Sequence, residues 1–167
     1  MKRRFYLFLM VFVITNLLVG CNNPKSLEDT FTSEHTNNDI IKVLKFNDET
    51  EAVILYTLNK DNKVSAAEYR QVNNKWKGSS DISENNAGKL SFGFTHQGEK
   101  NEEVLFGKIN DPNIEKVQVE KLSGEVLKAT IVNHNGTSYW YLVWTYGTSN
   151  LIGLNKDGQR IYNAEFK

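Results

Sequence analysis

Apolar and polar residues alternate along most of the chain after residue 39, which predicts β-strands rather than helices. Residues 40–46 form a first predicted strand, and residues 52–58 form a second one that is apolar on both faces. A strand without polar alternation is typical of a position that is buried on both sides of its sheet. Residues 64–72 predict the return strand, and a short strand follows around Trp76.

Turn residues divide the rest of the chain at short intervals. Asn73-Asn74 and Asn135-Gly136 predict two-residue hairpins, because Asn and Gly tolerate positive φ. We expect a long loop over residues 78–88, then a one-faced strand through Leu90, Phe92 and Phe94, then a turn over 96–100. The remaining predicted strands cover residues 104–109, 116–120, 127–131, 138–146, 151–154 and 160–166. About nine to ten short strands predict an all-β fold, an antiparallel sandwich or a barrel-like meander.

The first 20 residues follow a different pattern. Lys2, Arg3 and Arg4 precede a run of 15 residues, Phe5–Val19, that is apolar apart from Tyr6, Thr15 and Asn16. A helix needs roughly 20 residues to span the hydrocarbon core, so the run is too short for a permanent membrane span. A basic segment, an apolar run and small residues before a cleavage point are typical of a secretory signal peptide. We therefore expect residues 1–20 to be a signal-peptide helix that is removed.

The end of the apolar run carries the only cysteine of the chain. Leu18-Val19-Gly20-Cys21 resembles the lipobox of bacterial lipoproteins. The resemblance implies cleavage between Gly20 and Cys21 and attachment of a diacylglyceryl group to the Cys21 sulfur. Two acyl chains give stable anchoring where one does not, so the expected location is the outer side of the cytoplasmic membrane. The alternatives are an ordinary cleaved signal with an incidental Cys21, or a buried free cysteine.

Residues 21–38 are polar apart from isolated Leu27 and Phe31. Such a composition predicts a flexible tether behind the lipidated cysteine. The alternative is a short helical turn capped by Ser26 together with Asp29. The expected organisation is therefore a signal peptide over 1–20, a tether over 21–38 and one β domain over 39–167.

Charge and cysteine content exclude several classes of protein. Removal of residues 1–20 takes away three basic residues and no acidic one, which leaves 17 basic and 20 acidic residues and a formal net charge of −3. We therefore expect no nucleic-acid partner. No cysteine follows Cys21, so stability has to come from apolar burial, which the remaining 147 residues can provide.

The last third of the chain carries a second resemblance. The segment 106–117 contains the pattern G-x-I-x-D-P-x-I-x-x-V, and it is followed by Tyr139-Trp140-Tyr141 and by Lys156-Asp157-Gly158 near the end. Together these motifs resemble a group of small secreted proteins of bacilli. The resemblance implies a β fold and an extracytoplasmic location, and its motifs are structural.

Candidate catalytic and metal-binding residues are few. The three histidines, His35, His96 and His134, have no zinc-binding spacing, and neither H-E-x-x-H nor G-x-S-x-G occurs. Glu102 and Glu103 are adjacent on a predicted strand, so their side chains point to opposite faces. We therefore expect no catalytic residue, no cofactor and no metal ion.

The predicted strand 138–146 is rich in aromatic residues. Tyr139 and Tyr141 share one face, and Trp140, Trp144 and Tyr146 share the other. A strand that is apolar on both faces is usually buried, so we favour a core position. The alternative is an exposed aromatic platform that stacks on sugars or on a peptide.

These observations lead to one preferred hypothesis and one alternative. The preferred function is that of a lipid-anchored lipoprotein outside the cytoplasmic membrane, whose non-catalytic β domain binds a protein, a peptide or a cell-wall glycan. The alternative is an extracytoplasmic hydrolase of cell-wall or peptide substrates, with a site assembled around His96 or His134.

Overall fold

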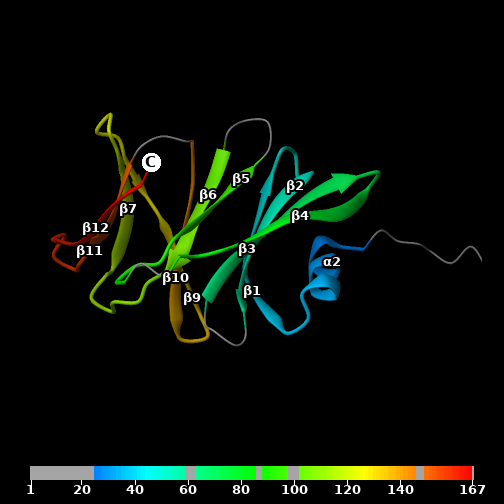
Figure 1. Cartoon of the computed structure of the whole chain (residues 1–167), viewed down its shortest axis with the longest axis horizontal. Helices are drawn as coiled ribbons and strands as arrows, with labels where there is room; N and C mark the ends of the chain where they lie inside the picture. Colours follow the sequence, from blue (N-terminus) through cyan, green and yellow to red (C-terminus); the bar gives the residue numbers. More distant parts are fainter. Residues whose placement is uncertain (1–24, 59–62, 86–87, 98–101, 146–148, 167) are drawn as a thin grey trace, which may run out of the picture.

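The computed structural model describes residues 25–58, 63–85, 88–97, 102–145 and 149–166 (Figure 1). Within these ranges one short helix, α2 (Leu27–Glu34), precedes twelve strands. The strands are β1 (Asn38–Phe46), β2 (Glu51–Leu58), β3 (Lys63–Val72), β4 (Lys75–Ser83), β5 (Gly93–Gln97), β6 (Glu102–Lys108), β7 (Lys116–Lys121), β8 (Val126–Lys128), β9 (Thr130–His134), β10 (Thr137–Thr145), β11 (Ser149–Leu154) and β12 (Arg160–Phe166).

The strands form three four-stranded antiparallel sheets. Sheet 1 has the order β1-β2-β3-β4, sheet 2 the order β5-β6-β10-β9 and sheet 3 the order β12-β11-β7-β8. Figure 1 shows the sheets one after another along the long axis of the molecule, with α2 at the outer side of sheet 1 and sheet 3 at the opposite end. The predicted all-β antiparallel fold is confirmed, with more strands than expected.

Three apolar layers hold the stack together, and the period of two along each strand explains them. Leu27 and Phe31 of α2 pack on one face of sheet 1, against Ala52, Ile54, Tyr56, Ala67 and Tyr69. The other face of sheet 1 packs on sheet 2 through Val53, Leu55, Val64, Ala66, Val104, Phe106 and Tyr139. Sheet 2 in turn packs on sheet 3 through Leu90, Leu105, Ile114, Val117, Val119, Trp140 and Leu151.

Strand β2 is apolar on both faces because it lies between two of these layers. Ile54 and Tyr56 face α2, whereas Val53 and Leu55 face sheet 2. The prediction of a strand buried on both sides is confirmed. The two predicted hairpins are also present, with φ of 53° and 59° at Asn73 and Asn74 and of 49° and 75° at Asn135 and Gly136.

The expected tether over residues 21–38 is wrong for residues 27–34, which form helix α2. Ser26 caps the helix, since its Oγ accepts a hydrogen bond of 3.0 Å from the Asp29 amide. Leu27 and Phe31 are four residues apart, so they share one helix face, and both are buried against sheet 1. The alternative of a capped helical turn is therefore the correct one, and the folded unit begins before residue 39.

The expected loop over 78–88 is wrong for residues 78–83, which continue strand β4. This strand is an edge of sheet 1 and exposes most of its residues, so it lacks the apolar alternation that would reveal it. The strand expected through 90–94 is displaced, since β5 begins at Gly93 and extends into the expected turn. Gly93 stands opposite Phe106 and faces the layer between sheets 1 and 2, whereas Phe94 is 50 % exposed.

The strand expected over 127–131 is two strands that belong to different sheets. β8 ends at Lys128 in sheet 3, and β9 begins at Thr130 in sheet 2. At the crossing, the Ala129 amide donates a hydrogen bond of 2.9 Å to the Val117 carbonyl. Apolar alternation continues through the crossing because Leu127, Ala129 and Ile131 all pack against the same core layer.

Candidate functional site

A cavity of about 390 Å³ opens between the end of α2 and the edge of sheet 1. We call it the α2 cavity. Ala67 has only a methyl group and Gly78 has no side chain, so the wall of the cavity leaves room beside the helix at these positions. The lining residues are Glu34, His35, Ala67, Glu68, Tyr69, Gly78, Ser79, Ser80 and Asp81.

His35 is held at the rim of the α2 cavity by aromatic contacts. It follows the last turn of α2, and its amide donates a hydrogen bond of 2.8 Å to the Phe31 carbonyl. Its ring stacks on Phe31 with centroids 4.6 Å apart and lies 5.2 Å from the ring of Tyr56. The Nε2 atom of His35 lies 3.7 Å from Oδ2 of Asp81 on β4. The helix end therefore places an imidazole beside a carboxylate.

Two tyrosines orient the carboxylates of the cavity. The Tyr69 hydroxyl donates a hydrogen bond of 2.8 Å to Oε2 of Glu34, and the Tyr56 hydroxyl donates one of 3.3 Å to Oδ1 of Asp81. Burial, followed by the nearby Asp81 carboxylate, raises the pKa of Tyr56 to about 12. Burial and the hydrogen bond to Glu34 also raise the pKa of Tyr69. Both phenols therefore stay protonated donors at neutral pH, and each occupies only one oxygen of its carboxylate.

Glu68 and Ser79 are the remaining polar residues whose side-chain contacts are defined. Glu68 accepts hydrogen bonds from Thr95 and, at 3.4 Å, from the Ser79 hydroxyl. A serine nucleophile would need its hydroxyl directed to a base such as His35, and the Ser79 hydroxyl is directed to Glu68 instead. Glu34 and Asp81 bring carboxylates to the cavity beside one imidazole, whereas the Glu68 carboxylate is bound by Thr95 of sheet 2; none of the described lining residues is a lysine or an arginine. The cavity thus presents hydrogen-bond acceptors and negative charge to a ligand.

Among the described residues, no group of three or more His, Cys, Asp or Glu side chains could hold a metal ion. In the same ranges, no helix is both long and apolar enough to cross a membrane.

The aromatic strand contributes to the core at the residues where the structure describes its side chains. Tyr139 is 3 % exposed in the layer between sheets 1 and 2, and Trp140 is 1 % exposed in the layer between sheets 2 and 3. Tyr141 is half-buried. An exposed platform is therefore wrong for Tyr139 and Trp140, because sheet 2 is covered on both faces. Tyr146 and the side chain of Trp144 lie outside the described residues.

His134, one of the two histidines around which a hydrolytic site was expected, is not among the residues that line the α2 cavity. His134 ends β9, and its Nε2 lies 3.2 Å from Nδ2 of Asn135. His96 is part of β5 in register with Glu103 of β6, and its side chain lies outside the described residues. Gly20 and Cys21, the expected cleavage and lipidation residues, also lie outside them.

Sequence reasoning missed the residues that line the cavity. His35 belonged to the expected tether and Asp81 to the expected loop, while Tyr56 and Tyr69 belonged to predicted strands with no assigned role. One signal was available, since Leu27 and Phe31 have the spacing of a helix face after a capping serine. A docked helix would have brought His35 to the edge of sheet 1.

A second hollow, of about 330 Å³, joins the motifs of the second resemblance. Asp111, Pro112 and Asn113 lie on one side of it, and Asn155 and Lys156 lie on the other. Both turns are held by their own side chains. The backbone amide of Asn113 donates a hydrogen bond of 3.0 Å to Oδ1 of Asp111. The backbone amide of Gln159 donates one of 2.8 Å to Oδ1 of Asn155. These contacts give the motif residues a structural role.

No protein-family model, no curated protein and no solved structure matches this chain.

Proposed function

We propose that this chain is a lipid-anchored lipoprotein on the outer side of the cytoplasmic membrane, with a non-catalytic β domain that binds a peptide, a protein or a cell-wall glycan. The lipobox Leu18-Val19-Gly20-Cys21 after a basic and apolar start supports the anchor. The α2 cavity supports the binding role, and it is the observation that carries this part of the proposal.

The cavity favours a ligand that carries hydrogen-bond donors. Its volume falls in the range of about 300–1,000 Å³ that is usual for small-molecule sites. The carboxylates of Glu34 and Asp81 are fixed by tyrosine hydroxyls, so further acceptor positions are already oriented before a ligand arrives. Hydroxyl groups of a glycan, or the amine and amide groups of a peptide, supply the matching donors.

A hydrolase is the second candidate, and one observation favours it. His35 and Asp81 stand 3.7 Å apart at the rim of the cavity, as a base and its orienting carboxylate would. We rank this function lower because the Ser79 hydroxyl is directed to Glu68 and not to His35. Product release separates the two functions: a hydrolase would cleave a bound peptide or glycan in the wild type and lose this activity in a His35→Ala variant, whereas a purely binding protein releases no product in either form.

The anchor is tested by fractionating cells that express a Cys21→Ala variant. We expect the wild-type protein to stay with the membranes after a high-salt wash, because two acyl chains hold it irrespective of charge. The variant should appear in the soluble fraction or the medium. Ser26→Ala is the matched control, since it changes a nearby residue and keeps the thiol. A Cys21→Ala protein that remains with the membranes at high salt would refute lipid anchoring.

The ligand site is tested by filling the cavity without removing a polar group. A Cβ at Gly78 would lie 3.3 Å from Oε2 of Glu34 and 3.5 Å from the Tyr69 ring, so the Glu34 carboxylate has to shift slightly and the valine methyl groups occupy the hollow, while the backbone keeps its strand conformation. We expect Gly78→Val to weaken binding of solubilised cell-wall fragments at least tenfold in calorimetric titration. Thr130→Val, at an exposed strand position of sheet 2, is the control for a nonspecific effect. Equal binding by wild type and Gly78→Val would exclude this cavity.

A further inference from the structure

The proposed anchor lies very close in sequence to the folded domain. Leu27, the first residue of α2, is six positions after Cys21 and is 3 % exposed against sheet 1. An extended chain spans at most about 3.3–3.6 Å per residue, so six residues reach about 20 Å. A lipidated Cys21 therefore keeps the start of α2 within about 20 Å of the bilayer surface.

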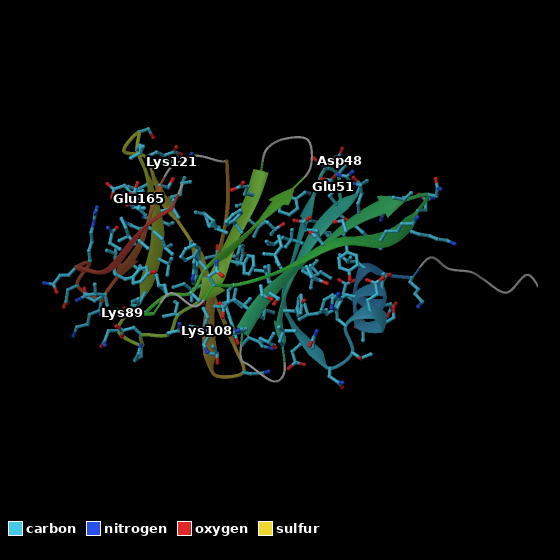
Figure 2. The ribbon with its side chains drawn as sticks, viewed as in Figure 1. Asp48, Glu51, Lys89, Lys108, Lys121 and Glu165 are labelled. Atoms are coloured by element: carbon cyan, nitrogen blue, oxygen red, sulfur yellow. The ribbon has the colours of Figure 1, made fainter. Side chains whose placement is uncertain are left out.

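The domain is longer than this connection. The core layers between α2, sheet 1, sheet 2 and sheet 3 follow one another along the stack (Figure 1). Packed layers are about 10 Å apart, so sheet 3 lies about 30 Å beyond α2. Figure 2 shows Lys121, on β7 of sheet 3, at the end of the molecule away from α2. On average the connection holds the α2 end nearer to the membrane than the sheet 3 end.

The outward face of α2 is polar and acidic, which keeps it out of the hydrocarbon core. Glu28, Asp29, Thr32 and Ser33 are exposed on the helix. The large apolar side chains that are exposed in the described residues, Val72, Phe94, Leu122, Val126 and Val143, all lie on other elements. Charged side chains are expensive to bury in hydrocarbon, so this face stays at the level of the headgroups.

We infer that the α2 end of the domain faces the lipid headgroups and that the α2 cavity opens within their reach. The cavity belongs to this end because Glu34 and His35, at the end of α2, form part of its wall. On this inference the ligand that donates hydrogen bonds to Glu34 and Asp81 is presented at the membrane surface. This inference rests on the proposed lipid anchor at Cys21.

Energy transfer between the protein and the bilayer tests the orientation. Three serine-to-cysteine variants carry a donor dye: Ser33→Cys on α2, Ser80→Cys at the cavity and Ser123→Cys in the turn between β7 and β8. Lipidation occupies Cys21, so each introduced thiol is the single labelling site, and mass spectrometry verifies the lipid. The lipidated proteins are placed in vesicles of phosphatidylglycerol and phosphatidylethanolamine that contain an acceptor-labelled lipid.

We expect transfer from positions 33 and 80 to be at least about twofold more efficient than transfer from position 123, because about 30 Å separates the two ends. Similar transfer from all three positions, or the highest transfer from position 123, would overturn the orientation. A protein that mass spectrometry finds without lipid would instead refute the proposed anchor. Labelled Cys21→Ala versions of the three variants should give transfer at the background level.

Discussion

Phe31 fixes helix α2 on sheet 1, so truncating it to alanine tests whether the helix belongs to the folded domain. Its side chain is 0 % exposed. Its ring centroid lies 4.6 Å from that of His35, 5.1 Å from that of Tyr56 and 6.4 Å from that of Tyr69. An eight-residue helix has almost no independent stability in water, so tertiary packing has to hold it in place.

The loss expected for Phe31→Ala is large. Truncation of a buried phenylalanine costs about 3–5 kcal/mol of unfolding free energy. Favourable contacts between aromatic rings contribute about 0.5–1.5 kcal/mol each beyond buried area, which places Phe31 in the upper part of that range. For a domain of this size, each kcal/mol of lost unfolding free energy lowers the Tm by about 3 °C, so the Tm of Phe31→Ala should be lower by roughly 10–15 °C.

Urea denaturation followed by tryptophan fluorescence measures this loss, and Phe94→Ala is the matched control. Phe94 is 50 % exposed, so the same chemical change should cost less than about 1.5 kcal/mol there. Hydrogen exchange gives a second readout, since the His35 amide bonded to the Phe31 carbonyl should be protected in the wild type only. Equal losses for the two variants, with an unprotected His35 amide in the wild type, would refute the docked helix.

Two further predictions concern the interior of the sheets. An added Cβ at Gly107 would overlap the Ser91 carbonyl oxygen and lie 2.7 Å from Nε1 of Trp140, so Gly107→Ala should lower the unfolding free energy by about 1–3 kcal/mol. Gly78→Ala is the control, and in urea denaturation it should lower the unfolding free energy by less than about 1 kcal/mol. Equal losses for the two variants would contradict the close packing around Gly107. Burial raises the pKa of Glu84, so the folded chain holds this proton more tightly and wild-type stability falls as pH rises from about 4.5 through the raised pKa. Glu84→Gln removes this titration, so the Tm of the variant minus the Tm of the wild type should increase as pH rises. A Tm difference that stays constant between about pH 4 and pH 8 would contradict the assignment of this pH dependence to Glu84.

The sequence predicted those parts of the fold that the residues of a single strand or a single turn determine. Strand β2 is apolar at consecutive positions, and only burial on both faces explains that pattern. The Asn-Asn and Asn-Gly pairs predicted their hairpins because they supply the positive φ that such turns need. The stacking of three sheets was not predictable from these local patterns, since nothing in the alternation from Leu127 to Ile131 marks the crossing between sheets.

The candidate site was not predictable for a related reason. Each of its polar residues is unremarkable in its own segment, and the site exists only because distant segments meet. His35 follows a helix with two buried apolar side chains, and Asp81 lies on an edge strand with little apolar pattern. Their partners Tyr56 and Tyr69 sit on interior strands, where an aromatic residue is expected for packing alone.

The motif residues lie on sheets 2 and 3 and in their turns, whereas the candidate site lies on the outer face of sheet 1. Gly107 accommodates the Trp140 indole, whose Nε1 donates a hydrogen bond of 3.2 Å to the Ser91 carbonyl. Ile114 is buried between sheets 2 and 3, where Gly153 leaves it room. These residues are restricted by packing between sheets 2 and 3. The α2 cavity lies on the far face of sheet 1 and none of its described lining residues belongs to a motif, so the packing that restricts the motif residues places no restriction on the chemistry of the cavity.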